Sequence, residues 1–270
     1  MAATDLLVIV TIVILNRIAG IYFPSSFLSI TPVCSVRSIL NFAAIDSSAW
    51  LTVAFTFDRF VAISCQKLKI KYCTKKVAAR VIGILSVLAF MKNVFLYFQM
   101  EPKYIVDNVP WLCSLKTEIY MIPGWIAYDF ISSSLTTFLP SVLILLLNAL
   151  TVRYILMTNK ARNRLRAQKN KENQSDPEME KRRHSIILLF TISGSFILLY
   201  LPSLITSIYV RIVKVTYSLG PIYILRQTGY MLQLMSSCVN PFIYAGTQSK
   251  FRARLADLFA QPLKIFTFWK

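Results

Sequence analysis

The most constraining feature of the sequence is a series of long apolar runs, each close to the length that a helix needs to cross a bilayer. About 20 predominantly apolar residues make one transmembrane helix. The runs cover residues 1–20, 34–61, 77–98, 122–153, 184–210 and 220–245. Hydrophobic residues make up 56% of the chain and charged residues only 16%, and both values depart from those of a soluble domain. The sequence therefore predicts an all-α membrane protein with six spans.

The basic residues divide the predicted connections into two groups. Twenty-two of the 30 Lys and Arg lie in three segments, 59–80, 153–183 and 250–270, which share one side of the membrane if the spans alternate. An excess of Lys and Arg marks the cytoplasmic side. The net charge of +18 is thus explained by membrane topology, which argues against a nucleic acid partner.

The chain has little material for catalysis or metal binding. His184 is the only histidine, and the five cysteines show no zinc-type spacing. We therefore expect no enzymatic activity.

A charged pair, Asp58 and Arg59, lies inside the second run, in "TFDRFVAIS". Cys34 precedes Arg59 by 25 residues, about 37 Å along an α-helix. This distance places Cys34 at the outer edge of the membrane and Arg59 at the cytoplasmic edge. Taken alone, the pair is a basic flank with a neutralising neighbour.

Several strings, in order along the chain, resemble motifs of the rhodopsin-like (class A) G protein-coupled receptors. "TFDRFVAI" is similar to the Asp-Arg-Tyr motif of the third helix, and "SSCVNPFIYAG" to the Asn-Pro-x-x-Tyr motif of the seventh. "MAATDLL", "FLPSVLILLLN" and "FILLYLPSL" resemble the second, fifth and sixth helices, and "SKFRARLADLF" the amphipathic helix after the seventh. The resemblance implies a receptor bundle at 1–248 that lacks the first of seven helices, followed by an amphipathic helix and cytoplasmic tail at 249–270.

The resemblance also implies a conformational switch. Asp58 would restrain Arg59 until the sixth helix moves outward and a G protein binds. The implied switch residues are Asp58, Arg59, Pro140, Phe196, Tyr200, Asn240, Pro241 and Tyr244. The sequence departs from the family at Phe60 and Asn148, where a Tyr is usual, and at Tyr200, where a Trp is usual. No acid matches the one often found at the base of the sixth helix.

Two further sites follow from the resemblance. Cys34 and Cys113 match the family's extracellular disulfide. An allosteric sodium ion would bind to Asp5, Ser48, Ser236 and Asn240, although Asp5 could equally be a hydrogen-bonded structural acid.

The ligand pocket implied by the family lies in the outer half of the bundle. The candidate residues are Arg37, Asn41, Ile45, Asp129, Tyr200 and Arg226. Asp46 is a further acid at this depth, with Arg37 and Arg226 as candidate cations. These charges suit a zwitterionic or amide ligand, or they pair with one another. Asn41 stands where amine receptors keep an Asp, which disfavours a monoamine.

The expected partners are an extracellular small molecule or peptide, membrane lipid, and a heterotrimeric G protein that contacts Arg59 and Leu68. The expected location is the plasma membrane. The fifth and sixth helices most resemble the orphan group around G-protein coupled receptor 139, which points to ligands such as aromatic amino acids. Two other classes remain open: a multi-span transporter or channel, and a truncated receptor fragment that does not signal.

Overall fold

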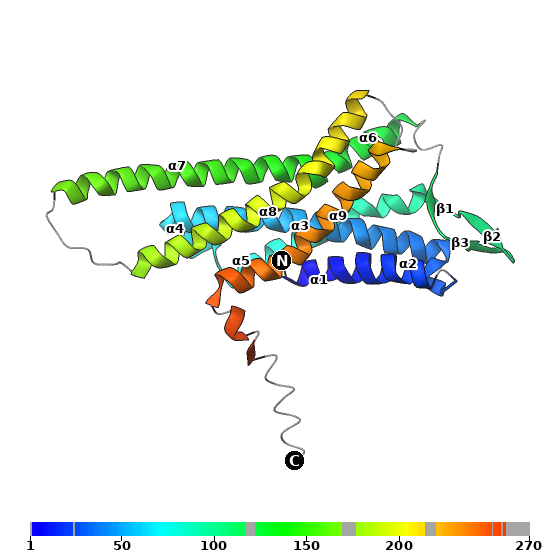
Figure 1. Cartoon of the computed structure of the whole chain (residues 1–270), viewed down its shortest axis with the longest axis horizontal. Coiled ribbons are helices and arrows are strands. Elements are labelled where there is room, and N and C mark those ends of the chain that lie inside the picture. The colour runs from blue at the N-terminus through cyan, green and yellow to red at the C-terminus, as the bar shows by residue number, and fades with distance from the viewer. Residues whose placement is uncertain are drawn as a thin grey trace, which may run out of the picture.

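The computed structural model is a bundle of long helices with a small β-ribbon at one end (Figure 1). It describes residues 2–23, 25–116, 122–168, 177–213, 220–249, 251–254 and 256–257. The helices are α1 (Ala2–Val8), η1 (Ile9–Ile18), α2 (Ala19–Tyr22), η2 (Phe27–Ser29), α3 (Thr31–Ser64), α4 (Gln66–Tyr72), α5 (Lys75–Asn93), η3 (Val94–Gln99), α6 (Pro123–Ser133), η5 (Ser134–Phe138), α7 (Leu139–Gln168), α8 (Pro177–Val213) and α9 (Pro221–Thr247). The strands are β1 (Met100–Glu101), β2 (Tyr104–Val106), β3 (Val109–Trp111) and β4 (Ser114–Leu115).

Each apolar run lies in a helical part of the described chain. Four described helices are long and apolar enough to cross a membrane. They cover Thr31–Ser64, Lys75–Gln99, Pro123–Ala161 and Ser185–Val210. The helical stretches at 2–22 and 221–247 fall outside that set, so the count of six spans stays a prediction.

The two helices that flank the basic segment 153–183, α7 and α8, extend beyond the predicted spans. The helix predicted to end at 153 continues to Gln168, and the one predicted to begin at 184 starts at Pro177. Both extensions are rich in Arg, Lys, Glu and Gln, which form helices readily and remain hydrated. Apolar runs therefore predict where a helix crosses the membrane, and they underestimate its length.

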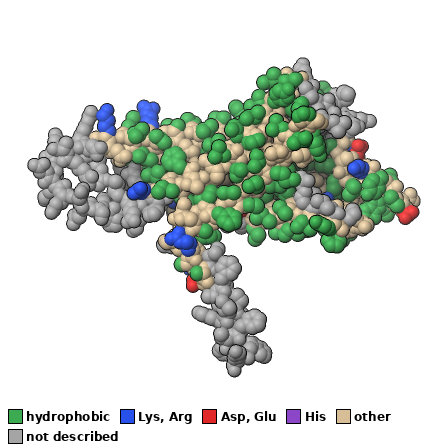
Figure 2. Space-filling model, in the orientation of Figure 1, with side chains coloured by type: hydrophobic (Ala, Val, Ile, Leu, Met, Phe, Trp, Pro, Cys, Tyr) green, Lys and Arg blue, Asp and Glu red, His purple; other side chains and the backbone are tan. Residues whose placement is uncertain are grey.

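The long helix α3 lies at the centre of the bundle and contacts α1, α5, α7 and α8 (Figure 1). Its middle turns are buried on nearly every face. Small residues at these turns, including Ala43, Ala44, Ser47 and Ser48, let the neighbouring backbones approach closely. Whereas small and polar residues are buried on α3, many hydrophobic side chains lie on the outer surface around the middle of the bundle (Figure 2).

The β-ribbon forms the outer connection between η3 and α6. β2 and β3 pair antiparallel around a two-residue turn, Asp107 and Asn108, with φ of 50° and 60°. Asp and Asn adopt this left-handed conformation more readily than other residues with a side chain. β1 and β4 pair in the same manner and bring the end of the ribbon back to the bundle.

The ribbon is fastened to the outer end of α3. The disulfide predicted between Cys34 and Cys113 is confirmed. Beside it, the Leu112 N–H donates to Ser29 O at 2.7 Å, and Thr31 Oγ1 donates to Leu112 O at 2.7 Å. The connection is therefore held by one covalent and two hydrogen bonds.

The closest approach between α8 and α9 depends on Gly229. A Cβ at this position would lie 3.0 Å from both the Cα and the N of Ser203. Backbone atoms cannot move aside as a flexible side chain can, so the two helices would have to separate. Gly194 on α8 has open space where its Cβ would be.

We expect Gly229→Ala to destabilise the bundle by about 1–3 kcal/mol, the usual cost of overpacking. Thermal unfolding of the purified chain in detergent should show a lower midpoint. Gly194→Ala is the matched control and should leave the midpoint unchanged or raise it, because alanine favours a helix. Equal midpoints for the two variants would contradict the close approach.

Candidate functional site

The charged pair at the cytoplasmic end of α3 forms in the structure. Arg59 Nη2 lies 2.7 Å from Asp58 Oδ2, and both side chains are about one-third exposed. The guanidinium lies over the ring of Phe55, 5.3 Å from its centroid. A contact between neighbouring residues that remains partly hydrated is weak, so little free energy is needed to open it.

A cavity of about 480 Å³ lies beside this pair. Its walls come from α3, α5 and the turn between α4 and α5, and include Phe55, Asp58, Arg59, Cys73 and Ile82. The Cys73 thiol donates to the backbone oxygen of Asp58 at 3.8 Å. Burial, followed by the hydrogen bond and the negative charge of the Asp58 side chain, raises the pKa of Cys73 to about 11. The thiol form is thus stabilised next to the pair.

The switch residues predicted in the middle of the bundle come together in one cluster. The rings of Phe196 and Tyr200 stack with centroids 4.0 Å apart. They pack with Ala49 and Val53 of α3 and with Ile144 of α7. Pro140 is fully buried one turn before Ile144. Large apolar side chains of α8 therefore pack against both α3 and α7.

Below this cluster, Asn148 takes part in a direct polar contact between α7 and α8. Its Nδ2 donates to Ser193 Oγ at 2.8 Å, and Ser193 is fully buried. The Asn148 Oδ1 is buried and has no hydrogen-bond partner among the described residues. Asn148, a departure from the Tyr that the resemblance implies at this position, thus joins α7 to α8.

Asn240, Pro241 and Tyr244, the switch residues predicted on the last helix, lie in α9. Tyr244 lies at the end of the bundle that holds the Asp58–Arg59 pair. Pro241 lies inside the helix. Tyr244 packs against a cluster made of Leu188, Ile192 and Ile243, which Phe55 also contacts. Because Phe55 carries the Arg59 guanidinium on its ring, one apolar cluster connects the charged pair with Tyr244.

Asp5 is buried and hydrogen-bonded across three helices. Its Oδ1 accepts from Ser48 Oγ at 3.0 Å and its Oδ2 from Asn240 Nδ2 at 3.0 Å. The fourth residue predicted for this site, Ser236, is buried on α9, as is its neighbour Ser237. No group of three or more His, Cys, Asp or Glu suited to a metal occurs among the described residues, so any ion here would bind to one carboxylate and neutral oxygens.

The six ligand-pocket candidates divide into two groups. Arg37, Asn41, Ile45 and Tyr200 are buried, and the first three recur every four residues along one face of α3. Asp129 and Arg226 are exposed. Arg37 donates to Leu15 O at 3.0 Å. The structure thus gathers one group around α3 and leaves the other two residues on the outside of their helices.

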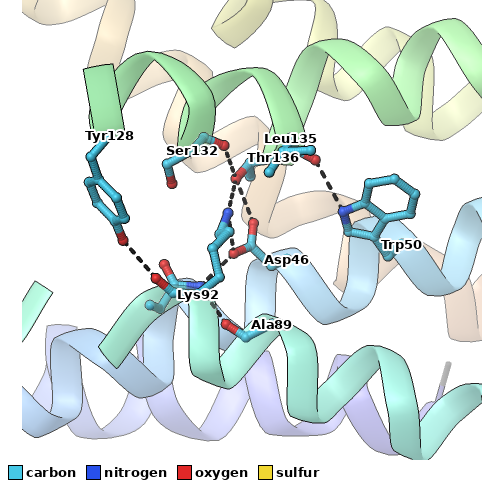
Figure 3. A network of polar contacts seen from close by, with 9 residues as sticks. Asp46, Trp50, Ala89, Lys92, Tyr128, Ser132, Leu135 and Thr136 are labelled. Carbon is cyan, nitrogen blue, oxygen red and sulfur yellow. Dashed lines mark hydrogen bonds and ion pairs between the residues drawn. The ribbon is translucent and has the colours of Figure 1, made fainter. Parts of the chain in front are cut away.

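The predicted pairing of Asp46 with Arg37 or Arg226 is wrong. The partner of Asp46 is Lys92 on α5, whose Nζ lies 2.6 Å from Asp46 Oδ2. Asn93 Nδ2 donates to the same oxygen at 2.5 Å, and Thr136 Oγ1 lies 2.6 Å from Oδ1 (Figure 3). The signal for Lys92 was present, since a lysine within an apolar span almost always has a partner inside the protein.

The predicted G protein contact Leu68 lies on α4 and is 44% exposed. It is therefore available to a partner at the cytoplasmic end, near the charged pair. The predicted amphipathic helix at 249–270 is helical at 251–254 and 256–257, and the rest of that segment lies largely outside the described residues.

Comparison with known protein families gives a match over most of the chain. The family described as 7 transmembrane receptor (rhodopsin family) matches residues 1–244. The match includes the charged pair, the Asp5 cluster and the Asn240–Tyr244 segment, and it agrees with the resemblance read from the motifs.

The raised pKa of Cys73 predicts that its thiol reacts slowly with alkylating reagents near neutral pH. An ordinary thiol has a pKa of 9.0, so at pH 8 the folded chain should hold about a hundredfold less thiolate at this position. Alkylation by iodoacetamide, read by mass spectrometry of the Cys73 peptide, should accelerate up to a pH of about 11 in the folded chain. In the denatured chain the rate should level off near pH 9. Identical pH profiles would contradict the buried, hydrogen-bonded thiol.

Proposed function

The chain belongs to the rhodopsin family of seven-transmembrane receptors, a family of membrane proteins that signal through G proteins, and we propose that it activates a heterotrimeric G protein when an extracellular ligand binds. In this proposal it acts at the plasma membrane and without catalysis of its own. The arrangement of the cytoplasmic end carries the proposal. There the weakly paired Arg59 lies on Phe55, which also packs against the Tyr244 cluster, and Leu68 on α4 is exposed.

The proposed mechanism is a change in the contacts between α8 and its neighbours. In the described state, α8 is held to α7 by Asn148 and Ser193 and to α3 by the Phe196–Tyr200 stack. Outward movement of its cytoplasmic half would break the first contact and expose Arg59 to the G protein. Such a switch needs two states that differ by only a few kcal/mol, which a ligand then biases.

The ligand is proposed to bind around Arg37, Asn41, Ile45 and Tyr200, and to be an aromatic amino acid or a short peptide. This proposal follows the likeness of the fifth and sixth helices to the group around G-protein coupled receptor 139. A buried guanidinium at Arg37 suits a carboxylate.

The experiment measures nucleotide exchange. Membranes that contain the 270-residue chain are mixed with purified G protein heterotrimers, and uptake of labelled GTP analogue is followed with aromatic amino acids or short peptides present. Arg59→Ala should reduce exchange to the level of empty membranes, because the cationic contact with the G protein is lost. Arg80→Ala is the matched control, since it removes an exposed charge from α5, and should keep the activity. Full activity of Arg59→Ala would refute the assigned role.

We also propose that the Asp5 cluster binds a sodium ion. A carboxylate, hydroxyls and an amide oxygen, from Asp5, Ser48, Ser236 and Asn240, form a donor set suited to a hard cation. The ion would stabilise the described packing of α1, α3 and α9 around the carboxylate.

Sodium at ten times its dissociation constant should stabilise the chain by about 1.4 kcal/mol. The measurement is the unfolding midpoint in NaCl compared with choline chloride at equal ionic strength. Asp5→Asn should remove the difference, and Asp107→Asn, in an exposed turn, should keep it. An equal sodium effect in the parent chain and in Asp5→Asn would leave Asp5 as a purely structural acid.

A further inference from the structure

The fifth-helix stretch of the bundle contains one residue more than a continuous α-helix would hold. Between α6 and α7, residues Ser134–Phe138 form the π-helical turn η5. The Leu139 N–H donates to Ser134 O, five residues back, whereas an α-helix would use Leu135 O. Pro140 has no N–H to offer in the next position. The extra residue therefore sits where the regular hydrogen-bond ladder is already interrupted.

Neighbouring helices hold this turn from outside. Trp50 on α3 donates its Nε1–H to Leu135 O at 3.1 Å, so it takes the carbonyl that the π-turn releases. Lys92 on α5 donates to Thr136 Oγ1 at 2.8 Å. The released Leu135 carbonyl is thus satisfied by a side chain of α3, and the Thr136 side chain joins the turn to α5, so that both neighbouring helices stabilise the π-turn.

The Thr136 hydroxyl has two acceptors within reach. Asp46 Oδ1 lies at 2.6 Å and Ser132 O at 2.8 Å (Figure 3). A hydroxyl carries one proton, so Thr136 bonds either to α3 or to its own helix. In the first case it bonds η5 directly to Asp46 on α3, and in the second only the bond from Lys92 to Thr136 Oγ1 joins this side chain to another helix. The same side chain can therefore make or break the direct bond between η5 and α3.

The register of α6 depends on the extra residue. In the π register, the Tyr128 hydroxyl donates to Lys92 O at 2.8 Å, and its neighbour Asp129 is exposed. If η5 became α-helical, α6 would rotate by about 100° and shift by about 1.5 Å relative to α7. Asp129 would then occupy the position on the α5 side that Tyr128 occupies in the π register. A carboxylate would thereby arrive beside Lys92.

We propose that η5 is a two-register hinge in which Lys92 exchanges Asp46 for Asp129 as its counterion. A buried ammonium is costly without a partner, and each register supplies one. Asp46 keeps the hydrogen bond from Asn93 Nδ2 in both, since Asn93 and Asp46 belong to helices that the shift does not move. The hinge turns the outer half of the fifth helix while α7 stays in place.

Cysteine cross-linking tests the register directly and needs no ligand or G protein. Phe95 and Tyr128 are in ring contact, with centroids 6.2 Å apart, so cysteines at both positions would face each other across the space of the two rings in the π register and can be joined by a short bis-maleimide. The full chain in membranes is treated with this reagent and the rate of cross-linking between the two positions is measured. All variants keep the native cysteines, which makes the rates comparable.

In this background, Asp46→Asn should slow the cross-link about tenfold, the effect of one charge-assisted hydrogen bond. Adding Asp129→Asn should restore the rate, because the second register then loses its counterion. Trp50→Phe, which removes the donor to Leu135 O, should behave in the same way and gives a second route if Asp46→Asn folds poorly. Asp107→Asn is the matched control and should leave the rate unchanged.

Two results would overturn the proposal. An unchanged rate in both Asp46→Asn and Trp50→Phe would mean that these side chains do not hold the register. A slower rate that Asp129→Asn fails to restore would mean that the helices merely loosen, without an exchange of counterions at Lys92.

Discussion

A polar group inside a bilayer must find its partner within the protein, and the structure is organised by the way α3 meets this requirement. Asp5 on α1 is satisfied by Ser48, and Lys92 on α5 by Asp46. The backbone oxygen of Leu135, which the π-turn releases, is satisfied by Trp50. Each contact fixes the height and rotation of one helix against α3, because displacing it would leave a charge or a carbonyl unpaired in an apolar medium. The remaining apolar side chains then fill the spaces between helices whose positions are already set.

The two ends of the bundle differ in how firmly they are held. At the outer end, the disulfide of Cys34 and Cys113 and the hydrogen bonds of Leu112 tie the β-ribbon to α3. At the cytoplasmic end, the Asp58–Arg59 pair is partly hydrated, and such pairs contribute at most about 1 kcal/mol. A bundle built in this way can rearrange at its cytoplasmic end without losing its outer structure. This asymmetry is what a membrane receptor needs if an outer signal is to change an inner surface.

Much of this arrangement could be predicted from the sequence. The apolar runs predicted the helices, and the placement of Lys and Arg predicts the sidedness. Cys34 and Cys113 are bonded as the resemblance implied, and the motif residues from Arg59 to Tyr244 lie in the helices to which the resemblance assigned them. The partners of buried polar residues were harder to predict. Arg37 and Arg226 were considered as cations near Asp46, whereas its partner is Lys92 on α5, because a sequence does not show which faces of two helices meet.

The sequence by itself determined which segments are helical and apolar, which side is basic, and which residue types are available at each depth. Hydrophobic length and charge are local properties, so they can be read without knowing the neighbours. The tertiary structure alone decided which side of each helix faces inward. That choice buried Arg37 and Asn41, exposed Asp129 and Arg226, and paired Asp46 with Lys92. The physical reason is that burial and pairing depend on which helix faces meet, and this is a property of the packed bundle rather than of any one segment. In the fifth-helix stretch, the π-turn at Ser134–Phe138 adds one residue and so sets the rotation of α6, and Trp50 of α3 binds the carbonyl that this turn releases.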